Sequence, residues 1–152
     1  MNTTQSGRSM LEMLAVLCVI GVLTVGVLLG YRQALIRYKT YRTHVEMSEI
    51  VDGVYRVCRL FSDLPNCGTN RGEEAVKDDI VDANIISEMK NPFGQDYEVH
   101  LGATSTVRTD VVDNDVCKEL EAEDWPAGVQ DGSDGGHAPR CDGSTLTLYL
   151  DP

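Results

Sequence analysis

Residues 10–30 read MLEMLAVLCVIGVLTVGVLLG, and this stretch decides how the rest of the chain is organised. From Leu11 to Gly30 every residue is apolar except Glu12 and Thr24. A helix of twenty residues is about 30 Å long, which matches the hydrocarbon core of a bilayer. Glycines, of which the stretch holds three, are common in membrane helices because they let neighbouring helices approach closely. We therefore predict a helix that can span a membrane.

The one carboxylate in this stretch, Glu12, lies just inside its front end. An acid at the middle of a bilayer costs roughly 2.5 to 3.5 kcal/mol, and the cost is smaller near the ends. Glu12 either marks a wet boundary where the membrane helix begins, or is buried and needs a positively charged partner. Composition alone leaves both interpretations open.

The residues in front of the apolar run give Glu12 a more specific meaning. Residues 7–12 read GRSMLE and are followed by MLAVL, a pattern that resembles the prepilin-type signal of type IV pilins and the related pseudopilins. In that family an inner-membrane peptidase cuts after a glycine, the new N-terminal residue is N-methylated, and the fifth residue after the cut is a glutamate. Gly7 and Glu12 stand at these two positions, and Arg8 stands where the family usually has Phe, Met or Leu.

The resemblance implies that prepilin peptidase removes residues 1–7 and that Arg8 becomes the methylated N-terminus. It implies an α+β fold, with a long N-terminal helix packed on a small antiparallel sheet and a disulfide-bonded C-terminal loop. The expected domains are the leader 1–7, a transmembrane and assembly helix 8–30, its amphipathic continuation 31–61 and a globular head 62–152. The expected partners are other copies of the chain, the peptidase, the inner-membrane pilus machinery and, before assembly, the membrane itself.

Charge is distributed very unevenly along the 152 residues. Residues 1–60 hold seven basic and four acidic residues, a net charge of +3, whereas residues 61–152 hold six basic and twenty acidic residues, a net charge of −14. Nucleic-acid binding needs a basic footprint, so the acidic outer part argues against that class of function. The length suits one modest domain plus an anchor.

Four of the five cysteines lie outside the apolar run, which holds only Cys18. An even number of such cysteines favours two disulfides and an oxidising compartment. Of the three pairings that four cysteines allow, we predict the neighbour pairing, Cys58–Cys67 and Cys117–Cys141, because it closes two short loops. A zinc site is the weaker alternative, since the chain contains no C-x-x-C motif.

The basic residues that flank the apolar run favour a cytoplasmic head, in conflict with the oxidising compartment that the cysteines indicate. Only Arg8 lies in front of it, whereas Arg32, Arg37, Lys39 and Arg42 lie behind it, and basic flanks favour the cytoplasm. The cysteines and the prepilin-type signal instead place the head outside the cytoplasm, first at the inner membrane and then on an extracellular pilus or fimbrium. We give these two signals the greater weight, because acidic heads of neighbouring copies offer the basic residues a second use.

No proline interrupts residues 31–61, so we predict that the helix continues to about Leu60. Apolar residues recur there in steps of three and four, which indicates one apolar face. They are Tyr31, Ala34, Leu35, Tyr38, Tyr41, Val45, Met47, Ile50, Val51, Val54, Val57, Cys58 and Phe61. We expect the second half of the helix to pack on its own head and the first half to pack on copies of itself.

The head reads as loops, short helices and strands. Residues 64–68 and 91–94 have turn composition, and the second turn resembles the one that leads into the sheet of many type IV pilins. We predict helices at 73–89 and 115–121, the latter capped by Asp113 or Asn114, and strands at 97–101, 107–111 and 145–150. Residues 125–139 look irregular. A Cys117–Cys141 bond would close a loop in the place where type IV pilins have their C-terminal disulfide.

Nothing in the sequence indicates catalysis, so we predict neither an enzyme nor a cofactor. The motifs G-x-S-x-G, H-E-x-x-H and the phosphate loop are absent. The three histidines, His44, His100 and His137, are far apart and lack metal-ligand spacing. Residues 131–136 resemble a calcium loop but lack the glutamate that such a loop needs, so an acidic turn is the better interpretation and no metal is predicted.

Two classes of function remain. The first is a structural filament subunit, either a pilin of a type IV pilus or a minor pilin or secretion pseudopilin, in which Glu12 of one copy pairs with the Arg8 amine of another. The second is a single-pass, membrane-anchored binding domain that acts alone. The second explains the anchor and the disulfides but not the spacing of Gly7 and Glu12.

Overall fold

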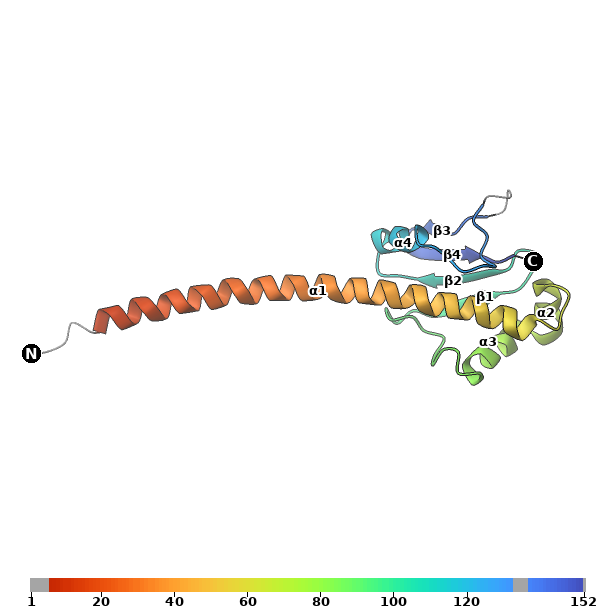
Figure 1. The fold of residues 1–152 in the computed structure, drawn as a ribbon, viewed down its shortest axis with the longest axis horizontal. Helices are drawn as coiled ribbons and strands as arrows, with labels where there is room; N and C mark the ends of the chain where they lie inside the picture. The colour runs from red at the N-terminus through yellow and green to blue at the C-terminus, as the bar shows by residue number, and fades with distance from the viewer. Residues whose placement is uncertain (1–5, 133–136, 152) are drawn as a thin grey trace, which may run out of the picture. The chain divides into compact units, whose positions relative to one another are not determined.

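The computed structural model describes residues 6–132 and 137–151. It divides into two compact units, Met1–Tyr38 and Lys39–Pro152. Helix α1, Ser6–Cys58, passes through both units (Figure 1). The predicted end of this helix, near Leu60, is two residues late, because the chain turns after Cys58 and the amide of Phe61 donates to the Cys58 carbonyl at 2.9 Å.

The first unit is helical and has no core of its own. From Met10 to Tyr38 every described side chain is exposed. Within the described part of the chain, one helix is long and apolar enough to cross a membrane, namely Met10–Cys58 of α1. The predicted apolar helix is therefore present.

The second unit is built on a four-stranded antiparallel sheet. Its strands are β1 (Tyr97–His100), β2 (Thr106–Asp110), β3 (Arg140–Asp142) and β4 (Thr145–Tyr149), in the order β1-β2-β4-β3 (Figure 1). The three predicted strands are present, each ending one residue early. The third strand in the chain, β3, was not predicted.

One hydrophobic core joins the sheet to the second half of α1. Alternate residues of the central strands, such as Val107, Leu146 and Leu148, are buried together with Met47 and Ile50 of α1. This arrangement confirms an α+β layout in which a long apolar helix accompanies a small antiparallel sheet.

The prediction of one continuous apolar face on α1 is wrong. Tyr41 is 69% exposed, and the residues of this turn that are buried are Thr40 and Thr43. Helix geometry explains the error, because each residue advances by about 100° and the six steps from Tyr41 to Met47 leave them a third of a turn apart. The apolar stripe that contacts the core is the later one: Met47, Ile50, Val51, Val54 and Cys58.

Two short helices follow α1. Residues 64–68, predicted as a turn, begin helix α2 (Leu64–Arg71). The Asp63 carboxylate caps it by accepting from the amide of Asn66 at 2.8 Å, and Pro65 lies in the first turn, where a helix tolerates proline.

Helix α3, Glu73–Asp82, is shorter than the predicted 73–89. Asn84 has a left-handed backbone with φ of 54°, which ends the helix, and Ile86 then turns into the core.

The turn before β1 is confirmed and is fixed by a buried side chain. The side-chain Nδ2 of Asn91 donates to Thr109 Oγ1 at 2.9 Å and to the Asp110 carbonyl at 2.6 Å. Its Oδ1 accepts from the backbone amides of Phe93 and Gln95. Asn91 therefore ties the turn to β2.

Helix α4, Asn114–Glu121, begins one residue before the predicted helix and has Asp113 as its cap. The Asp113 carboxylate accepts from the amides of Asp115 and Val116. Past α4, an isolated antiparallel bridge pairs Val129 with Leu150, the residue after β4. Part of the segment predicted as irregular therefore pairs with the end of the last strand.

Candidate assembly surface

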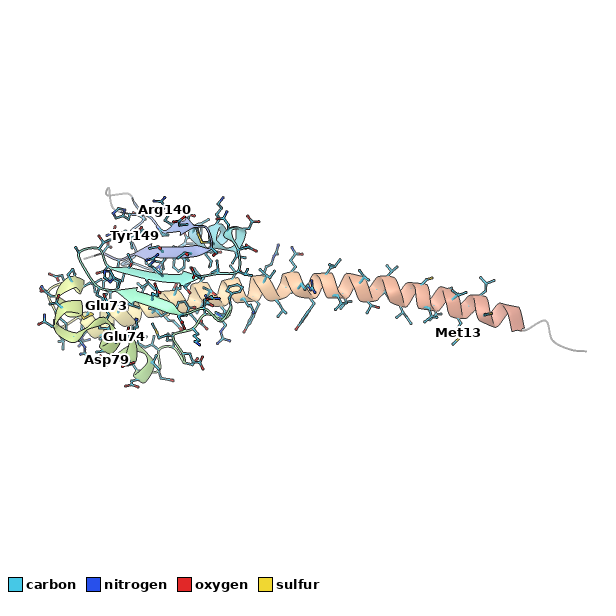
Figure 2. The ribbon with its side chains drawn as sticks, turned by 180° about the vertical axis from the view of Figure 1, so that it is seen from behind. Met13, Glu73, Glu74, Asp79, Arg140 and Tyr149 are labelled. Atoms are coloured by element: carbon cyan, nitrogen blue, oxygen red, sulfur yellow. A yellow bond between two sulfur atoms is a disulfide. The ribbon has the colours of Figure 1, made fainter. Side chains whose placement is uncertain are left out.

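The apolar part of α1 carries most of the large hydrophobic side chains that are exposed in the described part of the chain. Between Met10 and Leu29 the large hydrophobic side chains are 54–75% exposed; Met13 is labelled in Figure 2. Soluble monomers rarely expose apolar patches above a few hundred Å². This surface has to be covered by lipid or by protein.

The carboxylate of Glu12 lies within that apolar surface. Its side chain is exposed, and no hydrogen bond or ion pair to it exists among the described side chains, those of residues 10–132 and 137–151. Any covering that excludes water would leave this charge in need of a partner.

Gly7 and Arg8 lie in the first turn of α1, which begins at Ser6. The structure describes only the backbone of residues 6–9, so it does not test the predicted role of Gly7 and Arg8 in processing. Arg8 and Glu12 are four residues apart, about one turn of the helix.

The glycines of the apolar run pack against no other part of the chain that the structure describes. A methyl group added at Gly21, Gly26 or Gly30 would meet no other side chain or distant backbone atom within 4 Å. These positions leave the helix surface shallow, so that another helix can approach closely.

Both predicted disulfides are present. Cys58 at the end of α1 bonds to Cys67 on α2, and Cys117 on α4 bonds to Cys141 on β3, with Cα–Cα distances of 5.5 and 5.9 Å. Cys18 has a free thiol on the exposed apolar helix. The first bond fixes the end of α1, and the second joins α4 to the edge strand that precedes β4.

Two tyrosines, neither of which the sequence singled out, attach the rest of the head to α1. The hydroxyl of Tyr97 on β1 donates to Glu46 Oε2 at 2.9 Å, and Arg42 Nε donates to Glu46 Oε1 at 2.7 Å. Burial, reinforced by the Glu46 charge, raises the pKa of Tyr97 well above its usual value. A chain of three side chains thus joins β1 to the α1 turn at residues 42–46.

Tyr55 makes the second attachment, to the C-terminal segment. Its hydroxyl has one proton to donate and lies 2.7 Å from the Gly128 carbonyl and 2.9 Å from the Asp151 carbonyl. Burial, reinforced by the Asp151 charge, raises the pKa of Tyr55 to about 12. Gly128 has φ of 101°, and a Cβ there would lie 2.4 Å from Tyr55 Cε2, so this close approach needs a glycine.

Each histidine has a separate contact. His44 packs on Trp125 with ring centroids 4.5 Å apart, and His137 packs on Tyr149 at 4.7 Å. His100 Nδ1 lies 2.7 Å from Glu73 Oε1; Figure 2 labels Glu73 and Tyr149. The described residues contain no group of three His, Cys, Asp or Glu side chains that could hold a metal ion. Residues 133–136 of the calcium-like loop lie outside the described residues.

The open face of the sheet carries two arginines without ion-pair partners in the described structure. Arg108 on β2 and Arg140 on β3 line a polar hollow of about 380 Å³ together with Thr106, Asp142, Thr145, Thr147 and Tyr149. The hollow is shallow and open, in contrast to an enclosed catalytic pocket.

Searches against protein-family models and against curated proteins found no match to this chain.

Proposed function

We propose that this chain is a structural subunit of a type IV pilus or a pilus-like filament. The observation that carries the proposal is the exposed apolar stretch of α1, which holds one carboxylate, Glu12, five residues after Gly7 and without a partner among the described side chains. A surface of this kind needs a covering, and many copies of the same helix provide one. The pattern in residues 7–12 supports a filament over other assemblies, by its resemblance to the prepilin-type signal.

In the proposed mechanism, prepilin peptidase cuts after Gly7 and leaves a free amine on Arg8, which is N-methylated in a separate step that needs a methyl donor. The subunit then waits in the inner membrane with its head outside the cytoplasm, where the disulfides form. The Glu12 carboxylate of an incoming subunit attracts the Arg8 amine of a subunit already at the filament base. In a low-dielectric environment this attraction is stronger than at a surface, and it offsets the cost of a buried acid.

Packing of the apolar helices completes the assembly step. Bundling removes residues 10–29 from both lipid and water, and the open positions at Gly21 and Gly26 allow close helix approach. The acidic heads remain outside, where like charge keeps the finished filament soluble. A minor pilin or a secretion pseudopilin would use the same mechanism.

The test is Glu12→Gln, which keeps the size of the side chain and removes its charge. We expect normal cleavage and membrane insertion but a loss of filaments of at least tenfold, measured as the ratio of sheared filament to membrane pool. Mixed with wild type, the variant should still enter filaments, because a neighbour's carboxylate can meet its intact amine. Glu49→Gln is the matched control, since Glu49 is an exposed acid on the half of α1 that belongs to the head.

Equal filament yield from Glu12→Gln alone would remove the pairing mechanism and leave Glu12 as a boundary marker. Intact mass separates the filament subunit from a lone anchored domain. Loss of residues 1–7 plus one added methyl group supports the subunit, and retention of residues 1–7 supports the anchored domain. Gly7→Val should block cleavage and filaments together.

A further inference from the structure

The stretch that follows the apolar run combines aromatic and basic side chains. Tyr31 is 61% exposed and Tyr38 is 58% exposed, and Arg32 and Arg37 between them are also exposed. These four residues, which we call the collar, all belong to the first unit of the chain. Tyrosine rings at the end of an apolar span are typical of a membrane interface.

The charge of the collar is not neutralised along the helix. Residues 13–45 contain no aspartate or glutamate, in a chain whose net charge is −11. The next two basic residues have partners, since Arg42 pairs with Glu46 and the ammonium of Lys39 lies 5.4 Å from the centre of the Phe93 ring. Arg32 and Arg37 have no ion pair within the described ranges 6–132 and 137–151.

The direction of side chains in a helix brings the collar toward the apolar run. Each Cα–Cβ bond tilts toward the helix N-terminus, so Arg32 and Arg37 lean back toward Gly30. Two turns, about 10 Å, separate Tyr31 from Tyr38, and the headgroup layer on one side of a bilayer is roughly 5–8 Å thick. Long arginine side chains cover the remaining distance by snorkelling.

We propose that the collar binds the phosphate headgroups of anionic lipids in the membrane leaflet next to Gly30. A guanidinium group matches a phosphate with two parallel hydrogen bonds, and Arg32 and Arg37 point to different sides of the helix, so that each takes a separate headgroup. The proposal rests on the membrane stage of the proposed function. It also explains why basic residues follow the span on the side where charge bias alone would not place them.

A titration with defined lipids tests the collar. The full-length chain in zwitterionic phosphatidylcholine micelles is titrated with phosphatidylglycerol, and the lipids retained per chain are counted by mass spectrometry of the intact complexes. Each basic residue near an anionic surface contributes roughly fivefold in affinity, so we expect R32Q/R37Q to bind phosphatidylglycerol about 25-fold more weakly than wild type. Raising the ionic strength should weaken wild type and leave the variant nearly unchanged.

The matched control is R108Q/R140Q, which removes two exposed and unpaired arginines from the head and should not change lipid retention. Equal affinity of R32Q/R37Q and wild type would overturn the proposal. If R32Q/R37Q binds lipid as wild type does but forms fewer filaments, the partner of the collar is the acidic head of a neighbouring copy. A wild-type chain that retains neither lipid would contradict the membrane stage of the proposed function and the collar with it.

Discussion

The two halves of helix α1 differ in what stabilises them. Ile20 in the first half is 54% exposed, whereas Ile50 in the second half is fully buried against the head. Both halves are rich in apolar residues and neither is interrupted by proline. The comparison shows that the second half packs on its own chain, whereas the described side chains of the first half from Met10 to Tyr38 are all exposed.

The largest difference should appear when one isoleucine in each half of α1 is truncated to alanine. Ile50→Ala should lower the free energy of unfolding of the head by about 2–5 kcal/mol, because it leaves a cavity in the core. Ile20→Ala should change it by less than about 0.5 kcal/mol, because the side chain contacts no core. Urea unfolding followed by Trp125 fluorescence in detergent measures both. A comparable loss from Ile20→Ala would show that the first half also folds against the head.

The second-largest effect should come from removing a disulfide of the head, in contrast to removing the free thiol of the apolar half of α1. Removing Cys117–Cys141 with C117S/C141S should cost the head about 3 kcal/mol, since the bond joins residues 24 apart. The control Cys18→Ser lies in the bare half and should leave the urea midpoint unchanged. Equal midpoints for all three proteins would mean that the bond does not restrict the unfolded head. Reduction of the wild-type protein breaks Cys58–Cys67 as well, so it should lower the midpoint at least as far as C117S/C141S does.

A smaller effect should follow the loss of the Asn91 side chain. Asn91→Ala leaves the amides of Phe93 and Gln95 without their acceptor, at a cost of about 1–3 kcal/mol, whereas the Thr109 hydroxyl keeps its bond to the Asp96 carbonyl. Asn70→Ala is the control, since Asn70 is exposed and its amide bonds only within its own helix. Amide hydrogen exchange should show faster exchange at Phe93 and Gln95 in the first variant alone. Unchanged exchange there would show that the turn holds its shape without Asn91.

The smallest effect concerns alkaline pH. The pKa of Tyr55 rises from 10 to about 12 in the folded head, so the unfolded chain loses this proton first. Its contribution to stability is therefore complete below pH 10 and is lost as the pH rises from 10 to 12. The urea midpoint should fall more steeply over this range in wild type than in Tyr55→Phe. Identical slopes would place the Tyr55 hydroxyl in contact with water in the folded head.

Local chemistry allowed much of the head to be predicted. The Asp113 cap needs only residues within one turn, so α4 was predicted to within one residue. Strict alternation identified β1, β2 and β4. An even cysteine count and short separations were enough for both disulfides.

The errors occurred where distant contacts or short segments decide the structure. Pro65 and Gly68 have turn composition, yet Asp63 and Pro65 together form a helix start. Strand β3 has three residues, too few for a pattern, although Asp142-Gly143 is a hairpin signal and Gly143 has φ of 64°. The end of α3 depends on how Ile86 packs in the core, whereas the error on the apolar stripe of α1 follows from helix geometry alone.

The candidate assembly surface was predictable in part. The apolar run and the isolated Glu12 are visible in the sequence, because a continuous apolar segment long enough to cross a membrane consists of consecutive residues. The attachments through Tyr55 and Tyr97 were not predictable, since they join residues 96 and 51 positions apart. The collar needed the observation that its arginines remain without ion pairs in the described structure.

The position of β4 in the sheet determines when a newly synthesised head can finish folding. This strand is the last in the chain, yet it lies between β2 and β3, and Tyr55 contacts the carbonyl of Asp151. The sheet therefore closes only after β4 has left the ribosome and reached the head. Until then the Met47–Cys58 stripe lacks its contacts with β4, so a newly made chain exposes more apolar surface than the folded one and is prone to aggregate in that interval.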